Sequence, residues 1–427
     1  MQKIKIYGTM LIALLIAQTI VAQQVYDARG VGMAFSNAAD ARGLEQIGLN
    51  PAMLAVKHPF NFELNIFSAN AGFTNNSVSK GFYEQYFTTG DSLTLTDKSD
   101  ILNAIPTDGL QGQVSGRFNT LAVYMPHFSL ALTGIGSGYF NLPKEIAEIG
   151  LYGNEDLNRT YDFSSADASG WGGAEVSLGL GFNADFLRGG MFDFAAIGFS
   201  SKYIIGLQYA EVEKAEGYFQ NIGETNNFVK LDGLVEARRA TGGSGFAFDM
   251  GVVLQSKDKI TISAALLNAI GSVKWNAGTE MDFYSVNADS FGVSSDGFNT
   301  DSIFVTNDST YAIDPFSTRI PAVFDLGMAY HATKHFLLTT EFEQNMSKSM
   351  GTLKSTRLAF GTEFTGIPLL PLRVGMSFGG ARGFSTAFGM GLNLKYWFVD
   401  LALVNHGGFS TGKARGFTVA ATTRFRF

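Results

Sequence analysis

The chain ends in Gly416-Phe417-Thr418-Val419-Ala420-Ala421-Thr422-Thr423-Arg424-Phe425-Arg426-Phe427. Successive side chains of a strand point to opposite faces, so the odd-numbered residues share one face and the even-numbered residues share the other. The odd face is apolar apart from Thr423 and ends in an aromatic ring, whereas the even face is polar apart from Ala420. This pattern is typical of a membrane-spanning strand with lipid outside and a polar lumen inside.

The other end of the chain has the pattern of a secretory signal peptide. Residues 1–5 contain two lysines, residues 6–16 are almost wholly apolar, and Ala22 offers a small residue at a cleavage point. An uncleaved anchor is the alternative, but the apolar run is too short for a hydrocarbon core of roughly 30 Å. We therefore expect residues 1–22 to be removed. Without any cysteine, lipid modification of the N-terminus and disulfide bonding are both excluded.

The composition favours a membrane barrel over a soluble enzyme. The 427 residues include 50 Gly, 38 Phe and 15 Tyr, and only 16% are charged, against about a quarter in typical soluble domains. Membrane helices are not predicted, because no apolar run of the necessary length follows the signal. The net charge of −7 argues against a nucleic-acid partner. The even composition and the absence of a linker indicate one large domain.

Alternating segments predict about fourteen strands, an even number as bacterial single-chain barrels require. In the first strand, Phe60, Phe62, Leu64 and Ile66 form the lipid face, and Glu63 lies on the other. The remaining strands are predicted at 111–125, 127–141, 171–185, 192–210, 243–256, 260–273, 320–331, 335–346, 355–365, 371–379, 384–396, 397–406 and 415–427. The fold class is therefore all-β, a transmembrane antiparallel barrel over residues 59–427.

The connections between these strands alternate between short and long. Short turns of outer-membrane barrels face the periplasm and long loops face the medium. The long connections are predicted at 74–110, 142–170, 211–242, 274–319, 346–354 and 406–414. Residues 77–105 predict one or two short amphipathic helices, the second capped by Thr96 or Asp97.

Residues 275–318 form an acidic segment that contains seven Asp or Glu and no Lys or Arg. Clustered carboxylates are oxygen ligands suited to calcium, but the spacing of a calcium-binding loop is absent. A solvated acidic loop is therefore the favoured interpretation, and calcium binding is the alternative.

The segment between the signal and the first strand holds the functional clue. It contains Gly30 and Gly32, an Ala/Asp stretch at 38–41, and the motif Asn50-Pro51-Ala52. The segment resembles the N-terminal hatch of FadL-type barrels, the long-chain fatty-acid transporters of the outer membrane. That resemblance implies a fourteen-stranded barrel plugged from within by residues 23–58, which passes hydrophobic molecules across the outer membrane. A plainer alternative is that Asn50-Pro51 only ends a helix at 40–48 and starts the barrel.

Two further implications follow from the resemblance. The aromatic end at Phe427 resembles the signal that the barrel assembly machinery reads, so that machinery and outer-membrane lipid are expected partners. A FadL-like barrel also serves as accessory subunit of the type IX secretion system. Uptake of fatty-acid- or lipid-like molecules is therefore the leading hypothesis, and a protein partner in a secretion or assembly complex is the alternative.

The inward face of the strands carries charges of both signs. A structural network that stiffens the barrel is the favoured interpretation, and contact with a ligand carboxylate or with the hatch is the alternative. Arg424 and Arg426 are expected to approach Glu63, because the last strand closes on the first. The candidate luminal residues are Glu63, Asp325, Glu341, Glu343, Arg357, Glu363, Arg373, Lys395, Arg424 and Arg426.

Motifs for catalysis or metal binding are weak. Two segments, 375–379 and 408–412, match G-x-S-x-G, but neither has the strand, turn and helix that a nucleophile elbow needs. The five histidines have no metal-ligand spacing, and His331 and His335 are expected in a solvated turn. We therefore expect no enzyme activity, no cofactor and no resident metal.

Overall fold

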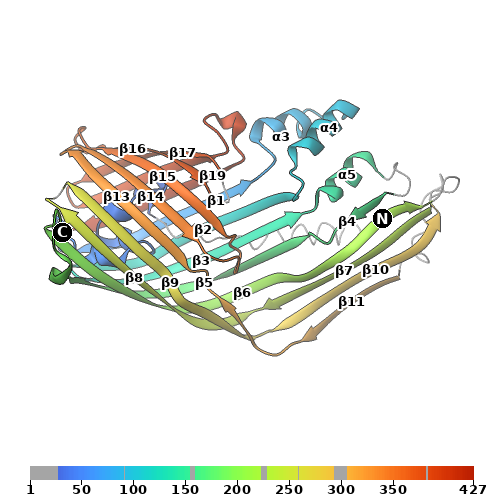
Figure 1. Cartoon of the computed structure of the whole chain (residues 1–427), viewed down its shortest axis with the longest axis horizontal. Helices are drawn as coiled ribbons and strands as arrows, with labels where there is room; N and C mark the ends of the chain where they lie inside the picture. The colour runs from blue at the N-terminus through green and yellow to red at the C-terminus, as the bar shows by residue number, and fades with distance from the viewer. Residues whose placement is uncertain are drawn as a thin grey trace.

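The computed structural model describes residues 27–90, 92–153, 159–222, 228–257, 259–292, 305–380 and 383–427. The predicted signal peptide, residues 1–22, lies outside them. Within the described residues, nineteen strands form one sheet, and fourteen of these follow one another around a ring. The ring closes because β1 (Glu63–Asn75) pairs antiparallel with β19 (Gly416–Arg426). The predicted all-β barrel of about fourteen strands is confirmed (Figure 1).

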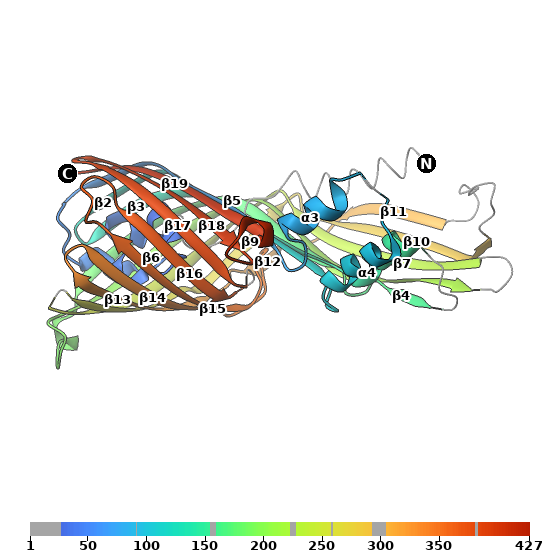
Figure 2. The same ribbon diagram turned by 90° about the horizontal axis from the view of Figure 1, so that it is seen from above.

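The other barrel strands run around the wall in chain order, each antiparallel to the next. Short turns gather at the end that holds the C-terminus, which is the periplasmic end of an outer-membrane barrel (Figures 1 and 2). The strands are β2 (Leu110–Met125), β3 (Phe128–Leu142), β5 (Asp167–Asn183), β6 (Phe194–Ile222), β8 (Gly242–Ser256), β9 (Ile260–Ala277), β13 (Val323–Thr333), β14 (Phe336–Asn345), β15 (Ser355–Phe364), β16 (Leu372–Gly379), β17 (Ser385–Leu394) and β18 (Trp397–His406).

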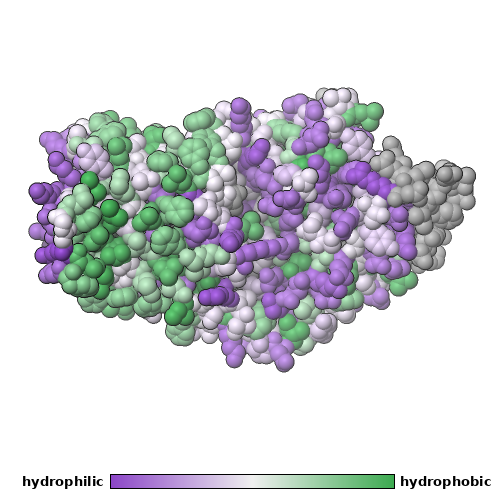
Figure 3. Space-filling view, in the orientation of Figure 1, coloured by the Kyte–Doolittle hydropathy of each residue, from purple (hydrophilic) through white to green (hydrophobic). Residues whose placement is uncertain are grey.

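The outer surface of the ring is apolar, as the alternation predicts. On β5, Leu178, Leu180 and Phe182 are exposed, whereas Ser177 on the opposite, luminal face is buried. Figure 3 shows hydrophobic side chains gathered over the half of the molecule that the barrel occupies, with hydrophilic residues beyond both ends. Such a band is the lipid-facing belt of a transmembrane barrel. Among the described residues, no helix is both long enough and apolar enough to cross a membrane.

The long-loop end continues as sheet, which corrects two predicted loops. Strand β6 runs on to Ile222, and β7 (Phe228–Ala240), β10 (Glu280–Gly292) and β11 (Val305–Ala312) extend this sheet well beyond the barrel (Figure 2). Two short strands, β4 (Thr160–Asp162) and β12 (Phe316–Arg319), pair with β6 and β9. Segments 211–242 and 274–319 lack alternating hydrophobicity because water, not lipid, surrounds this part of the sheet.

The acidic segment is partly neutralised within that extension. Arg239 of β7 pairs with Glu280 at 2.6 Å and with Asp282 at 2.9 Å. Residues 293–304 lie outside the described part, so the calcium alternative stays a prediction there.

Three short helices lie at the long-loop end (Figure 1). They are α3 (Lys80–Phe87), α4 (Leu95–Ala104) and α5 (Lys144–Tyr152). The first two were predicted, but the N-cap of α4 is Thr94, and Asp97 completes its capping box from inside the helix. The third was not predicted.

The start of the first strand is also corrected. Phe60, expected on the lipid face, is buried at the short-turn end, where its ring lies 4.5 Å from the guanidinium of Arg426 and packs against Tyr124. The strand begins only at Glu63, so the alternation does not extend back to residue 60.

Candidate functional site: a plug inside the barrel

Residues 27–56 fill the short-turn half of the lumen as a compact plug, and all but Arg42 are buried. The segment folds as short pieces, the helix α2 (Ala28–Gly32) and the 3-10 turns η1 (Ala38–Asp40), η2 (Gly43–Gln46) and η3 (Pro51–Ala55). Asp27 caps α2 by accepting from the backbone N–H of Arg29 at 2.8 Å. Four glycines and Pro51 help to keep each piece short, so the chain turns often enough to fit inside the barrel.

Arg29 is the centre of the ion pairs that fasten the plug. Its guanidinium lies 2.8 Å from both Glu45 and Glu363 and also contacts Asp40 at 2.5 Å. Glu363 belongs to the wall strand β15, whereas the other two carboxylates belong to the plug. Arg42 repeats the contacts with Asp40 and Glu363 from a more exposed position. One buried arginine therefore ties together two parts of the plug and the wall.

The C-terminal strand supplies the other arginines of this group. Arg424 contacts Asp27 at 2.9 Å, Glu45 at 3.3 Å and Glu63 at 3.4 Å. Arg426 contacts Glu45 at 3.1 Å and Glu63 at 3.0 Å. Both residues thus approach Glu63, and they also hold the plug.

Arg373 completes the group by joining Glu363 of β15, at 2.7 Å, to Asp400 of β18, at 2.5 Å. Asp400 also contacts Arg424 at 3.1 Å. We call this set the plug latch. It combines five arginines with six carboxylates, so its charges nearly balance: Arg29, Arg42, Arg373, Arg424, Arg426, Asp27, Asp40, Glu45, Glu63, Glu363 and Asp400.

Two carboxyl groups of the plug are shifted in opposite directions. Burial raises the pKa of Asp27 to about 6, although Arg424 opposes the rise. Burial also acts to raise the pKa of Glu45, but Arg29, Arg424 and Arg426 outweigh it and bring that pKa down to about 2. The number of arginines around each carboxyl decides the direction.

On the side of the plug away from the latch, uncharged hydrogen bonds attach the plug to the wall. The Asn50 side chain accepts from the N–H of Ala52 at 2.9 Å and donates to the carbonyls of Val252 on β8 and Ala264 on β9 at 3.0 and 3.2 Å. The motif therefore both shapes its own turn and binds the wall. Glycine makes room for it, since a Cβ on Gly198 would lie 2.2 Å from backbone atoms of Pro51 and Ala52.

Gly32 makes a similar close approach on the latch side. A Cβ there would lie 2.8 Å from the Cα of Gly389 on β17, so backbone meets backbone between plug and wall. Gly30 lies in the same helix, and its carbonyl accepts from the N–H of Phe35 at 2.8 Å.

A second charged group lies in the lumen on the side of the plug that faces the long loops. Arg357 of β15 contacts Glu341 at 3.2 Å and Glu343 at 2.8 Å on β14, and it donates to the plug carbonyls of Ala34 and Phe35, each at 3.0 Å. Asp325 of β13 lies opposite Glu343 in register.

Above the plug, the lumen contains a cavity of about 130 Å³. Paired charges border it, among them Arg117 with Glu175 and Arg357 with Glu343. Its apolar lining comes from the plug, the wall and one loop: Phe35, Ile135, Trp171, Ile204, Ile320 and Met350.

The loop between β14 and β15 covers this cavity. Met350 is 1% exposed, its carbonyl accepts from the Ser137 hydroxyl on β3, and the N–H of Gly351 donates to Ser169 on β5 at 3.3 Å. Segment 346–354, predicted as an outer loop, therefore folds inward and reaches the opposite wall.

Two residues lie elsewhere than the sequence predicted. Lys395, expected in the lumen, is exposed in the turn between β17 and β18, with its ammonium over the ring of Tyr396. The strand ends at Leu394, one residue before it. His331, expected in solvent, lies 3.1 Å from Asp40 of the plug.

The sequence candidates did not include six residues of the plug latch: Asp27, Arg29, Asp40, Arg42, Glu45 and Asp400. Charged residues within an otherwise apolar, Gly-rich plug were the available signal for the first five, since buried charges are rare unless paired. Asp400 interrupts an apolar strand and offered the same signal.

These features define the class of protein: a transmembrane β-barrel with a plug folded from its own N-terminal segment. Residues 51–404 match the model of a family of unknown function (DUF5723), so the chain belongs to that family. No curated protein matches the chain.

Solved structures with a similar course of the chain include the toluene transporter TbuX of Ralstonia pickettii, with 12% identity, 95% of this chain and 99% of that chain covered, and a TM-score of 0.49. A FadL homologue of Pseudomonas aeruginosa has 11% identity, coverage of 96% and 100%, and a TM-score of 0.49. The toluene transporter TodX of Pseudomonas putida has 10% identity, coverage of 96% and 98%, and a TM-score of 0.47.

Proposed function

We propose that this protein is an outer-membrane barrel that admits hydrophobic small molecules through its plugged lumen. The observation that carries the proposal is the cavity between the plug and segment 346–354, because it lies on the lumen axis where a molecule from the medium would pause before the plug. Its aromatic and aliphatic lining suits an apolar ligand.

The size of the cavity narrows the class of ligand. An apolar cavity of about 150 Å³ is known to hold benzene, whereas sites for drug-sized molecules have about 300–1,000 Å³. At about 130 Å³, the resting cavity accommodates a single-ring or short branched molecule. A fatty-acid tail requires segment 346–354 or the plug to move.

The wall charges around the cavity are compatible with this ligand class. Arg117 and Glu175 face each other at 3.4 Å, and Lys202 pairs with Asp249 at 2.7 Å. Because each of these cations already has a carboxylate, the pairs form a polar rim that leaves the apolar side chains to contact the ligand.

The path through the lumen then has three steps. A ligand passes segment 346–354, occupies the cavity against Phe35 and Trp171, and leaves toward the periplasm when the plug shifts. Because the plug fills the lower lumen, its movement controls release.

Two adjacent isoleucines on β6 provide a matched test. Ile204 lines the cavity and is 2% exposed, whereas Ile205 faces the lipid side and is 40% exposed. We expect fluorobenzene to bind the purified protein, detected by ¹⁹F NMR in detergent. Ile204→Trp fills the cavity and abolishes binding, and Ile205→Trp leaves it unchanged. Equal binding of fluorobenzene by the two variants, or no binding by the wild type, would contradict the proposal.

A second function, as subunit of a secretion or assembly complex, is supported by the extended sheet. Within the described residues, β11 pairs with β10 alone and all of its residues are exposed, so its other edge offers a place where another chain can add a strand. Mild-detergent purification followed by mass spectrometry separates the two functions. A stoichiometric protein partner without any bound small molecule favours the complex.

A further inference from the structure

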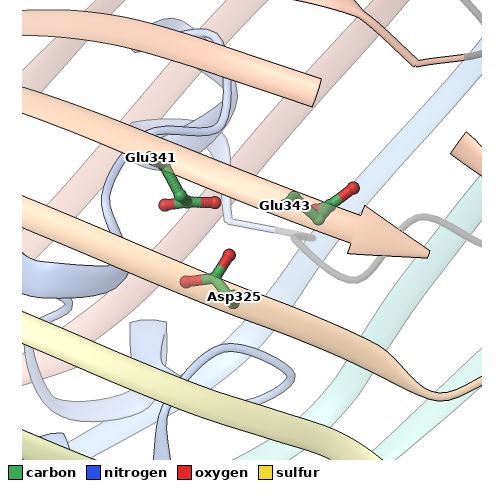
Figure 4. A group of neighbouring side chains, drawn as sticks. All are labelled: Asp325, Glu341 and Glu343. Carbon is green, nitrogen blue, oxygen red and sulfur yellow. The ribbon is translucent and has the colours of Figure 1, made fainter. Parts of the chain in front are cut away.

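Three carboxylates in the barrel wall form a group that the plug latch does not include. Asp325 on β13 pairs in register with Glu343 on β14, and Glu341 lies two residues away on the same face of β14. Oxygens of the three lie within 4.8 Å of one another. Figure 4 shows Asp325 and Glu341 facing each other from the two strands, with Glu343 farther along β14. Asp325 and Glu341 are 2% and 1% exposed.

Within the described residues, one arginine accompanies these three carboxylates. Arg357 contacts Glu341 and Glu343, and it also acts electrostatically on Asp325. Three carboxylates with one arginine leave two negative charges, whereas the plug latch has nearly equal numbers of each sign. Uncompensated buried charge is unfavourable by several kcal/mol per ion, so a further positive charge is expected here.

One buried oxygen of the group and one on a neighbouring strand lack partners among the described residues. There, Oδ1 of Asp325 accepts no hydrogen bond, and the hydroxyl of Ser263 on β9 makes none. Ser263, Gly327 and Glu341 lie side by side on three successive strands. A Cβ on Gly327 would lie 2.9 Å from Ser263 Oγ, so the hydroxyl leans over the glycine on the buried face. Buried polar atoms normally have a partner.

We propose that Asp325, Glu341 and Glu343 bind one divalent cation, Ca²⁺, with the Ser263 hydroxyl as a further oxygen ligand. A charge of +2 balances the two excess negative charges. Carboxylate and hydroxyl oxygens are the ligands that Ca²⁺ takes in proteins, whereas Mg²⁺ demands near-ideal octahedral geometry and keeps several waters. Ligands from separate strands also suit the irregular coordination of Ca²⁺.

The site joins the wall to the plug. Glu341 accepts from the N–H of Ala38 at 2.9 Å, and Arg357 holds the carbonyls of Ala34 and Phe35. Glu343 and Arg357 line the cavity, which provides a route by which the cation reaches the site. Bound Ca²⁺ therefore stabilises the docked plug, a property that is independent of whether the cavity carries hydrophobic molecules.

The test measures Ca²⁺ binding to the full-length protein in detergent after removal of metal with EDTA. We expect one Ca²⁺ per chain by isothermal titration calorimetry and elemental analysis. Asp325→Asn with Glu343→Gln lowers the affinity at least about tenfold, because two charged ligands are lost. Glu343→Gln alone is the second variant if the double variant does not fold, since this side chain is 17% exposed.

Asp249→Asn is the matched control. Asp249 is also a buried luminal carboxylate, but it has its own cation in Lys202 at 2.7 Å, so we expect this variant to bind Ca²⁺ as the wild type does. Failure of the wild type to bind at roughly millimolar Ca²⁺ would overturn the proposal. Undiminished affinity in the double variant would overturn it too, and would place the ion elsewhere, for example in the acidic segment 275–318.

Discussion

The two sides of the plug are attached to the barrel by different interactions. Residues 27–46 contact β15 and β19 through ion pairs of the plug latch, whereas residues 50–56 contact β5, β6 and β8 through close packing and the Asn50 hydrogen bonds. Ion pairs respond to pH and to the loss of one partner, and close backbone packing responds to added volume. The latch side is therefore the side that can release, with the Asn50-Pro51-Ala52 side as its pivot.

The largest effect is expected from Arg29→Gln. This change leaves Asp40, Glu45 and Glu363 facing one another, and removing one partner of a buried ion pair costs about 3–5 kcal/mol. Because the chain has no cysteine, an added Ala41→Cys in the buried plug reports release through its reaction with a maleimide. Arg42→Gln is the control, since its more exposed guanidinium contacts two of the same carboxylates. Equal labelling of both variants would contradict the central role of Arg29.

A smaller effect is expected from Gly198→Ala on the packed side. The new Cβ would lie 2.2 Å from backbone atoms of Pro51 and Ala52, and overpacking of this kind costs about 1–3 kcal/mol. We expect residues 50–56 to be displaced, which raises single-channel conductance in planar bilayers. Gly172→Ala on β5, where the nearest atom lies at 3.9 Å, should leave conductance unchanged. If conductance rises equally in both variants, general damage to the barrel is responsible instead of displacement of the plug.

Acidification should loosen the plug at the short-turn end, where the ring of His58 packs against Phe60 and Tyr124. Burial lowers the pKa of His58 to about 4, and the stability that the neutral ring contributes is present above pH 6.5 and is lost as the pH falls toward 4. Glu45, with its pKa lowered to about 2, acts in the same direction below pH 4.5.

We expect maleimide labelling of Ala41→Cys to rise between pH 6.5 and 4, and the rise to be smaller in His58→Gln. Asp27, whose pKa is raised to about 6, acts in the opposite direction but titrates in both proteins, so the difference between them isolates the histidine. Identical pH profiles would remove His58 from the explanation.

The smallest effect is expected from Lys395→Gln, because this exposed turn residue contacts neither side of the plug. Surface substitutions of this kind change stability by less than about 0.5 kcal/mol. Thermal unfolding in detergent should be unchanged, and a clear shift would mean that Lys395 has a partner in solution.

Most of the barrel could be predicted from the sequence because its signal is local. Each membrane strand contacts lipid on one face and the lumen on the other. Apolar and polar residues therefore alternate along it, as from Thr418 to Arg426, and this alternation fixes which residues face the lumen. The strands β7, β10 and β11 could not be predicted this way. Water surrounds them, and their pairing depends on neighbours distant in sequence, such as Glu280 opposite Arg239.

The luminal site was likewise predictable from the sequence only in part. The sequence by itself determined which charges face inward, because side-chain alternation assigns Glu63, Glu363, Arg373 and Arg424 to the lumen. Only the tertiary structure decided which of them meet: Arg29 reaches Glu363 across 334 residues of sequence, and His331 reaches Asp40 across 291. Alternation specifies the face of a strand, but the partner of a buried charge depends on how the barrel closes around its plug.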